Sequence, residues 1–268
     1  QVGLFNLMEE GDIQIKGYQV RLPLDVLLVS SANPEDYTNR GRIITPLKDR
    51  YGAQIRTHYP RTSDVEIQIM EMEHRRYEDG RLIVVPEFMK EIVAEISKEA
   101  RKSPDVNQRA GVSVRISISN YESLIGNALR RAIHTNEKVV VPRISDLLYL
   151  APSTMGKLEL ETVEEERSEQ IMEELVKNAV ATVFARHCDT KDLETLLAQF
   201  KEGVQVSITE FMPSRSYTRL IKRIDGFSEC LDKLDCKNGQ ATIASGVEFV
   251  LEGLHVHRKL NKAKVGSG

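Results

Sequence analysis

The first candidate for chemistry is an asparagine that follows a short apolar run. Residues 26–29 (VLLV) form a continuous apolar stretch typical of a buried parallel strand, and the turn signal Ala-Asn-Pro follows at 32–34. In open α/β sheets, ligands bind at the carboxyl ends of the strands, so Asn33 is a candidate ligand contact. An asparagine before proline also favours a plain turn, and the local sequence leaves both interpretations open.

Basic side chains are concentrated in the next segment. Residues 37–51 contain four cations, which are Arg40, Arg42, Lys48 and Arg50. A guanidinium is a planar fork of donors that suits phosphate or carboxylate oxygens. By its local sequence, Arg50 could equally pair with Asp49 or Asp36 on a solvated face.

The cysteines indicate no metal or disulfide framework. Cys188, Cys230 and Cys236 are an odd number in a long chain, which predicts reduced thiols in a cytoplasmic protein. A zinc site could be assembled from Cys230, Cys236, His187, His255 and His257. Because no close Cys-x-x-Cys pair is present, reduced thiols are the preferred interpretation and no metal site is expected.

Composition excludes several classes of protein. The chain has 268 residues, 41% hydrophobic and 29% charged, with a net charge of −3, which is the balance of a core-forming protein rather than a disordered one. Proteins that coat nucleic acid or lie on membranes carry a basic excess, so neither partner is expected. No apolar run approaches the ~18 residues of a membrane span, and no signal peptide opens the chain.

The first third of the chain predicts mixed elements. Residues 2–10 have helical spacing up to Gly11, so the chain is expected to begin inside a helix. Alternation over 12–22 predicts a β-hairpin, and 24–31 predicts a buried strand.

The rest of the chain predicts helices. They are expected over 65–77 (capped at 62–64), 86–102, 117–136, 143–151, from the acidic stretch 159–169 to 186, 190–202, 214–223 and 245–260, with an alternating patch over 204–208.

Four segments together resemble a known family. LLVSSANPEDY (27–37), ITPLKDRYG (44–52), RTHYPRTSDVEIQIM (56–70) and GVSVRISISNYESL (111–124) resemble, in this order, the AAA+ ATPases of the MoxR and magnesium-chelatase I-subunit group. The resemblance covers about residues 1–160. It implies an α/β core followed by an all-α part. The expected domains are the end of the AAA+ core (1–61), a helical lid (62–158) and a helical extension (159–268).

The resemblance also implies roles for single residues. Asn33 would be the sensor 1 group that orients the attacking water, and Arg50 the arginine finger that reaches the neighbouring subunit's nucleotide. Arg40 and Arg42 are rival fingers on the same loop. Arg115 would be sensor 2 and would contact the phosphates from the lid. A finger supplied in trans can be worth roughly 10³–10⁵ in rate.

Arg115 also has a plain structural interpretation as an ordinary residue near a helix start. A cation at that end is mildly unfavourable, so a phosphate partner explains its position better. Tyr51 departs from the phenylalanine usual in the family's finger segment, which is a small aromatic change.

The larger departure is a missing motif. The sequence contains no Gly-x-x-x-x-Gly-Lys-Ser/Thr, and the nearest approach is Met-Gly-Lys-Leu at 155–158. No apolar strand ending in Asp-Glu is present either. In the family both would precede Gln1. ATP and Mg²⁺ are therefore expected cofactors of a longer protein, and this chain alone is predicted to hydrolyse no ATP.

The resemblance thus predicts an ATP-driven remodelling motor. It would assemble into a ring, expected to be hexameric, and act on a protein substrate or a partner with a von Willebrand A-type domain. Two alternatives remain. One is a non-catalytic scaffold derived from an AAA+ protein. The other is a transcription activator, for which neither the expected Gly-Ala-Phe-Thr-Gly-Ala loop nor a helix-turn-helix is found.

Overall fold

The hairpin expected over 12–22 is present in the computed structural model, which describes residues 7–8, 12–21, 27–31, 45–108, 110–161 and 165–263. Strand β1 (Asp12–Ile15) pairs antiparallel with β2 (Tyr18–Arg21). Gly17 forms their turn with a φ of 85°, a conformation that glycine adopts without strain. The chain divides into two compact units, 1–58 and 59–268.

The buried strand expected over 24–31 is wrong for the part that the structure describes. Residues 27–31 are irregular, and the side chains of Leu27 and Val29 are 90% and 82% exposed. A buried strand needs neighbours for its backbone N–H and C=O groups. Among the described residues of this unit the strands are β1 and β2, which pair with each other. The predicted helix over 2–10 lies almost wholly outside the described residues.

Three helices form the first layer of the second unit, where sequence signals predicted them. They are α3 (Ser63–Glu73), α4 (Glu87–Ala100) and α5 (Arg115–Thr135). The Thr62 side chain accepts a hydrogen bond from the Val65 N–H and caps α3. Asn136 ends α5 in the left-handed conformation. These helices confirm the pattern, with ends shifted by a few residues.

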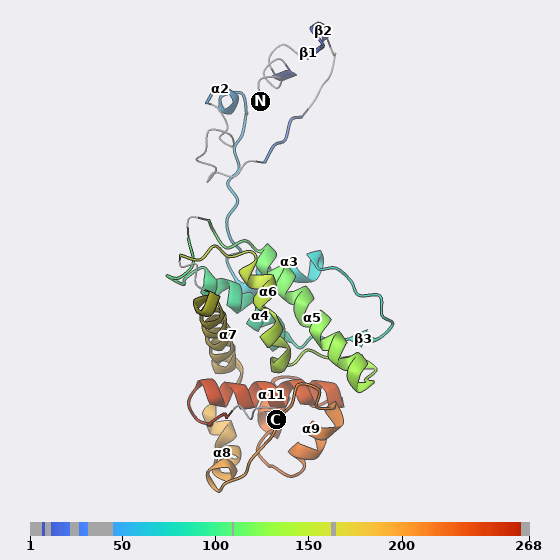
Figure 1. Cartoon of the computed structure of the whole chain (residues 1–268), viewed down its shortest axis with the longest axis vertical. Coiled ribbons are helices and arrows are strands. Elements are labelled where there is room, and N and C mark those ends of the chain that lie inside the picture. Colours follow the sequence, from blue (N-terminus) through green and yellow to red (C-terminus); the bar gives the residue numbers. More distant parts are fainter. Residues whose placement is uncertain are drawn as a thin grey trace. The chain divides into compact units, whose positions relative to one another are not determined.

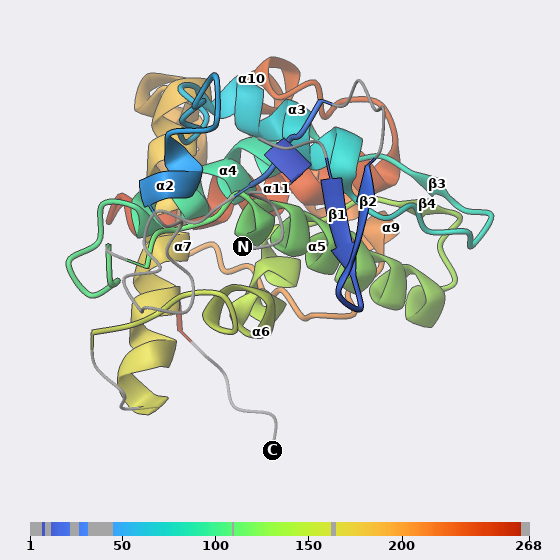
Figure 2. The same cartoon turned by 90° about the horizontal axis from the view of Figure 1, so that it is seen from above.

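Short elements lie before α4 and after α5 in the sequence. The helix expected over 143–151 is divided into a 3-10 helix, η2 (Ile144–Tyr149), and α6 (Ala151–Met155). Strands β3 (Leu82–Ile83) and β4 (Val139–Val140) lie side by side in parallel (Figure 2) and were not predicted.

The remaining helices are α7 (Glu165–His187), η3 (Thr190–Leu193), α8 (Glu194–Lys201), α9 (Ser214–Ile221), α10 (Ser228–Lys233) and α11 (Gln240–Val256). Helix α11, drawn in red in Figure 1, packs beside α9 and on α7. Helix α10 was not predicted, and residues 204–208 form no strand. Every helix in the described part is too short or too polar to cross a lipid bilayer.

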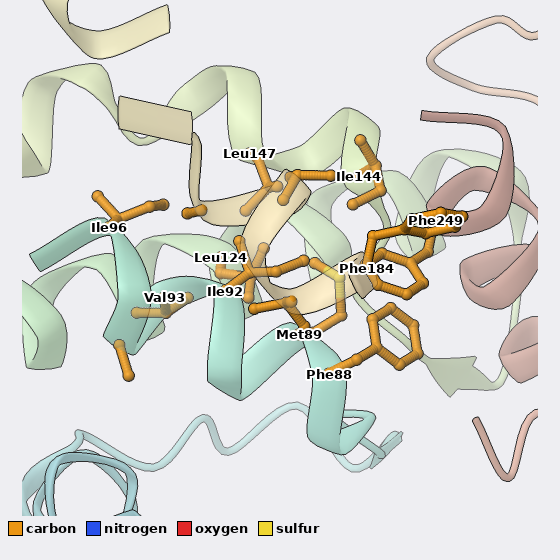
Figure 3. Close-up of a cluster of buried hydrophobic side chains, with 14 of the residues drawn as sticks. Phe88, Met89, Ile92, Val93, Ile96, Leu124, Ile144, Leu147, Phe184 and Phe249 are labelled. Atoms are coloured by element: carbon orange, nitrogen blue, oxygen red, sulfur yellow. The ribbon is translucent and has the colours of Figure 1, made fainter. Parts of the chain in front are cut away.

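One core joins the helices on both sides of residue 158. Figure 3 shows Phe88 of α4 beside Phe249 of α11 and Phe184 of α7. The Phe88 and Phe249 rings stack with centroids 4.5 Å apart, and the Phe184 and Phe249 centroids are 5.7 Å apart. Gly253 of α11 faces Phe184 so closely that an added Cβ would overlap the ring. The residues predicted as lid and as extension therefore share their packing, and the three-domain division stays a prediction.

A buried polar network crosses the same region. Arg143 is fully buried, and its guanidinium donates to the Met212 carbonyl (2.7 Å) and to the Ser214 hydroxyl (2.6 Å). Glu248 accepts hydrogen bonds from the Tyr217 hydroxyl and the Ser145 N–H. These bonds join η2, α9 and α11. Moving one of these elements would leave a buried charge unpaired, which is costly, so the bonds hold the three elements in place.

The expectation of three reduced thiols is wrong for two of them. Cys188 and Cys230 form a disulfide across 42 residues of sequence, and Cys236 is a buried free thiol. The spacing of the cysteines alone could not reveal which side chains meet. At the level of class, the described fold is mostly helical with two small two-stranded ladders, in keeping with an α/β part followed by an all-α part.

Candidate functional site

Arg50 follows a single helical turn in the first unit. Helix α2 (Thr45–Lys48) precedes it, and Arg50 Nη1 donates a hydrogen bond to the Pro46 carbonyl at 2.8 Å. The neighbouring Tyr51 hydroxyl accepts a hydrogen bond from Ser30 Oγ at 2.7 Å. Two segments quoted for the resemblance, 27–37 and 44–52, are thus in contact, and the Arg50 side chain is half-buried beside them.

Three predicted site residues cannot be placed. Asn33, Arg40 and Arg42 lie outside the described residues. Their roles as sensor 1 and as rival fingers stay predictions, as does the choice between Arg50 and its two rivals.

Arg115 lies at the first residue of α5 in the second unit and is exposed. Its N–H is bonded to Ser113 Oγ at 3.3 Å, and the Ile116 N–H bonds to the Ser113 carbonyl at 3.0 Å. The Ser-x-Arg segment therefore forms the opening turn of the helix. Within the described ranges no carboxylate forms an ion pair with the Arg115 guanidinium.

The start of α5 is held by a network that sequence reasoning missed. The Tyr59 hydroxyl accepts a hydrogen bond from the Val112 N–H at 2.9 Å, and the Arg101 guanidinium lies 4.6 Å from the centre of the Tyr59 ring. Arg101 also donates two hydrogen bonds to the buried Glu66 carboxylate, at 2.7 and 2.8 Å. The Ser117 hydroxyl of α5 donates to the same carboxylate. A fixed backbone is what a helix terminus needs to present a side chain reproducibly.

One signal in the sequence could have found part of this network. Glu66 lies four residues before Met70, and both face the interior of the unit on α3. A carboxylate on the apolar face of a helix demands a partner, because an unpaired buried charge is strongly destabilising. That partner, Arg101, is 35 residues away, and its identity could not be deduced from spacing.

A cavity of about 440 Å³ lies beside α3, β3, α4 and α5, and neither Arg50 nor Arg115 lines it. Its lysine, Lys90, forms ion pairs with Glu71 (2.6 Å) and Glu87 (3.0 Å). Burial lowers the pKa of Lys90, but its bonds to the two carboxylates outweigh that effect and raise the pKa above its usual value. The Lys90 ammonium is therefore already neutralised within the protein.

The described side chains show no metal centre. In the described ranges no group of three or more His, Cys, Asp or Glu side chains is placed to hold an ion. The zinc arrangement considered from the sequence is excluded at Cys230, which is bonded to Cys188.

No protein-family model matches the chain, and no solved structure matches it. Among curated proteins, the chain is similar to YeaC of Bacillus subtilis (strain 168), described as an uncharacterized protein. The two are 24% identical over 173 residues, which is 58% of this chain and 51% of YeaC. The chain thus spans about half the length of this relative.

Proposed function

We propose that this chain is the downstream part of a ring-forming AAA+ ATPase, which couples ATP hydrolysis to remodelling of a partner protein or to its maturation by metal insertion. The observation that carries the proposal is the position of Arg115. It is an exposed guanidinium on the first turn of a 21-residue helix, with no ion pair among the described residues and with a firmly anchored backbone.

The physical argument concerns the end of the helix. The first N–H groups of a helix are unbonded and carry partial positive charge, so an arginine there is unfavourable unless an anion is bound. The same end is a natural site for phosphate. In α5 the N–H groups of Arg115 and Ile116 are already bonded to Ser113, so the Arg115 guanidinium is the group that would contact the phosphates of a nucleotide, in the role that the sensor 2 resemblance implies.

The other proposed contacts come from the first unit. Arg50 would supply charge stabilisation to the nucleotide of the neighbouring subunit, with Arg40 and Arg42 as rivals, and Asn33 would orient the attacking water. The Ser30–Tyr51 hydrogen bond supports this assignment, because it joins the predicted sensor 1 and finger segments. Bound Mg²⁺ would neutralise charge on the phosphates, and its ligands would belong to the P-loop and Walker B segments, which this sequence does not contain.

The test uses the whole protein that carries this chain. We expect Mg²⁺-dependent ATP hydrolysis, measured as phosphate release. Arg50→Ala should abolish turnover, by roughly 10³-fold or more, while nucleotide binding is largely kept. Arg115→Ala should weaken both binding and turnover. Arg61→Ala, which removes another exposed arginine of the second unit, is the matched control and should change neither.

The outcomes separate the proposal from its alternatives. Full turnover in Arg50→Ala would show that Arg50 is not the arginine finger. The role would then belong to Arg40 or Arg42, or the protein would have no finger. A whole protein that binds no nucleotide, and whose stability is the same with and without ATP, would favour a non-catalytic scaffold. The mass of the assembly with and without ATP, measured by light scattering, tests the proposed hexameric ring. We also propose that the whole protein acts in the cytoplasm. Its partner would be a protein substrate or a protein with a von Willebrand A-type domain.

A further inference from the structure

The Cys188–Cys230 disulfide has two sulfurs in different environments. Cys188 directly follows α7 and is 6% exposed, whereas Cys230 lies on α10 and is fully buried. A cavity of about 470 Å³ reaches the Cys188 side of the bond, and Cys230 does not line it. Thiol–disulfide exchange depends on which sulfur an incoming thiolate can reach. Of the two bonded cysteines, Cys188 lines this cavity and Cys230 does not.

Charged and titratable side chains line much of this cavity. Its charged and titratable lining residues are Arg186, His187, Asp189, Lys233 and His257. Arg186 and Lys233 are each paired with a carboxylate, Glu95 and Asp192. Both side chains remain partly exposed, at 38% and 50%, and Asp189 adds a carboxylate to the same lining, so cations and anions are balanced around the cavity.

Lys233 is a cation close in sequence to the leaving sulfur. It follows Cys230 by three residues on α10, and residues at this spacing share one face of a helix. A nearby ammonium stabilises a thiolate, which makes the sulfur a better leaving group.

We propose that Cys188 is a modification site, at which a small thiol of the glutathione type opens the Cys188–Cys230 disulfide and forms a mixed disulfide. The incoming thiolate attacks Cys188 Sγ and a new S–S bond forms. The bond to Cys230 breaks, its electron pair stays on Cys230 Sγ, and that thiolate takes a proton from water. A second thiol then attacks the sulfur of the bound small thiol. The two small thiols leave together as their disulfide, and Cys188 is released as a thiolate.

The third cysteine takes no part in this exchange. Cys236 is 1% exposed, and burial raises the pKa of its thiol to about 12. A protonated, inaccessible thiol neither attacks nor is attacked, so Cys236 serves as an internal reference.

The experiment uses the folded protein purified without reductant and reduced glutathione as the probe. After acid quenching and alkylation, tryptic peptides 187–191 and 224–233 are examined by mass spectrometry. Before treatment the two should be linked to each other. After brief treatment, glutathione should be on 187–191 and the alkyl group on 224–233, in excess over the reverse pattern by about tenfold or more. The peptide that carries Cys236 should show neither glutathione nor a disulfide.

Three results would overturn the proposal. They are unlinked peptides before treatment, glutathione mainly on 224–233, or a bond that opens only after denaturation. A second measurement tests the role of charge. Lys233→Gln should slow opening several-fold, whereas Lys237→Gln, which removes a lysine paired with Asp232 away from the cavity, should leave the rate nearly unchanged. Equal effects of the two variants would remove Lys233 from the mechanism.

Discussion

At the scale of single residues, Glu91 shows how neighbours set a charge. Its carboxylate lies 2.7 Å from His187 Nε2 and 3.5 Å from Arg186 Nη1. Burial raises the pKa of Glu91, but its bond to His187 and the charges of His187 and Arg186 outweigh burial. The pKa therefore lies below its usual 4.5.

This shift predicts the pH dependence of folding. The unfolded carboxyl binds its proton at higher pH than the folded one, so the contribution of Glu91 is present above pH 4.5 and is lost as pH falls below it. Glu91→Gln should lower the free energy of unfolding most near neutral pH, and the difference from wild type should shrink in acid. Urea unfolding between pH 3 and 7 measures this. Glu173→Gln, at an exposed ion pair with Lys177, is the control and should change little at any pH.

Gly111 is a second position where one residue decides local structure. Its φ is 77°, and an added Cβ would lie 2.8 Å from the Tyr59 hydroxyl. Gly111→Ala should therefore destabilise the protein by about 1–3 kcal/mol, through backbone strain and contact with Tyr59. Gly203→Ala is the control. Gly203 also has a positive φ, 101°, but an added Cβ would meet no atom within 4 Å, so this variant measures the backbone strain without the contact. In a Tyr59→Phe background the Gly111→Ala effect should shrink, and an unchanged effect in urea unfolding would exclude the contact.

At the scale of elements, the approach of α11 to α7 requires the absence of a side chain at position 253. An added Cβ there would overlap the Phe184 ring. Gly253→Ala should lower the free energy of unfolding by about 1–3 kcal/mol, as overpacking does in cores. Phe184→Leu removes the obstructing ring, so the double variant should recover part of that loss. If the two effects simply add in urea unfolding, the helices do not meet at this contact.

Local signals predicted most helices, because caps and apolar spacing act within one element. Thr62 and Pro86 mark helix starts whatever surrounds them. The strand expected over 26–29 was wrong for residues 27–29, which the structure describes, since an apolar run forms a strand only where other strands pair with it. The two-residue strands β3 and β4 were missed because too few residues alternate for a period to be seen.

The candidate site divides in the same way. The helix start near Arg115 was predicted from residues close in sequence, and the structure places Ser113 and Arg115 in one helical turn. The sensor 2 role stays a prediction. The anchors of that turn could not be predicted, because Glu66 meets Arg101 across 35 residues. The disulfide was missed for the same reason. Contacts between distant residues depend on the packing of whole helices.

At the scale of the whole molecule, one hydrophobic core extends across the domain boundary that the sequence predicted after residue 158. The main described core cluster begins at Ile67 and ends at Leu254, and α4 packs on α7 within it. The sequence predicted a lid over 62–158 and a separate extension over 159–268. A helical extension that folded by itself would need its own core, but α4 of the predicted lid packs on α7 of the predicted extension, and Phe88 of α4 stacks on Phe249 of α11.

This arrangement makes a prediction about fragments. Residues 59–268 form one unit, so we expect a protein of these residues to unfold in a single cooperative transition, followed by circular dichroism in urea. Residues 159–268 alone would lose the packing surface that α4 supplies to α7, and should show a broad transition and bind hydrophobic dye. A sharp transition of 159–268 alone would show that the extension is an independent domain. The matched comparison is the fragment 59–268. It contains α4 and α5, so Phe88 can stack against Phe249.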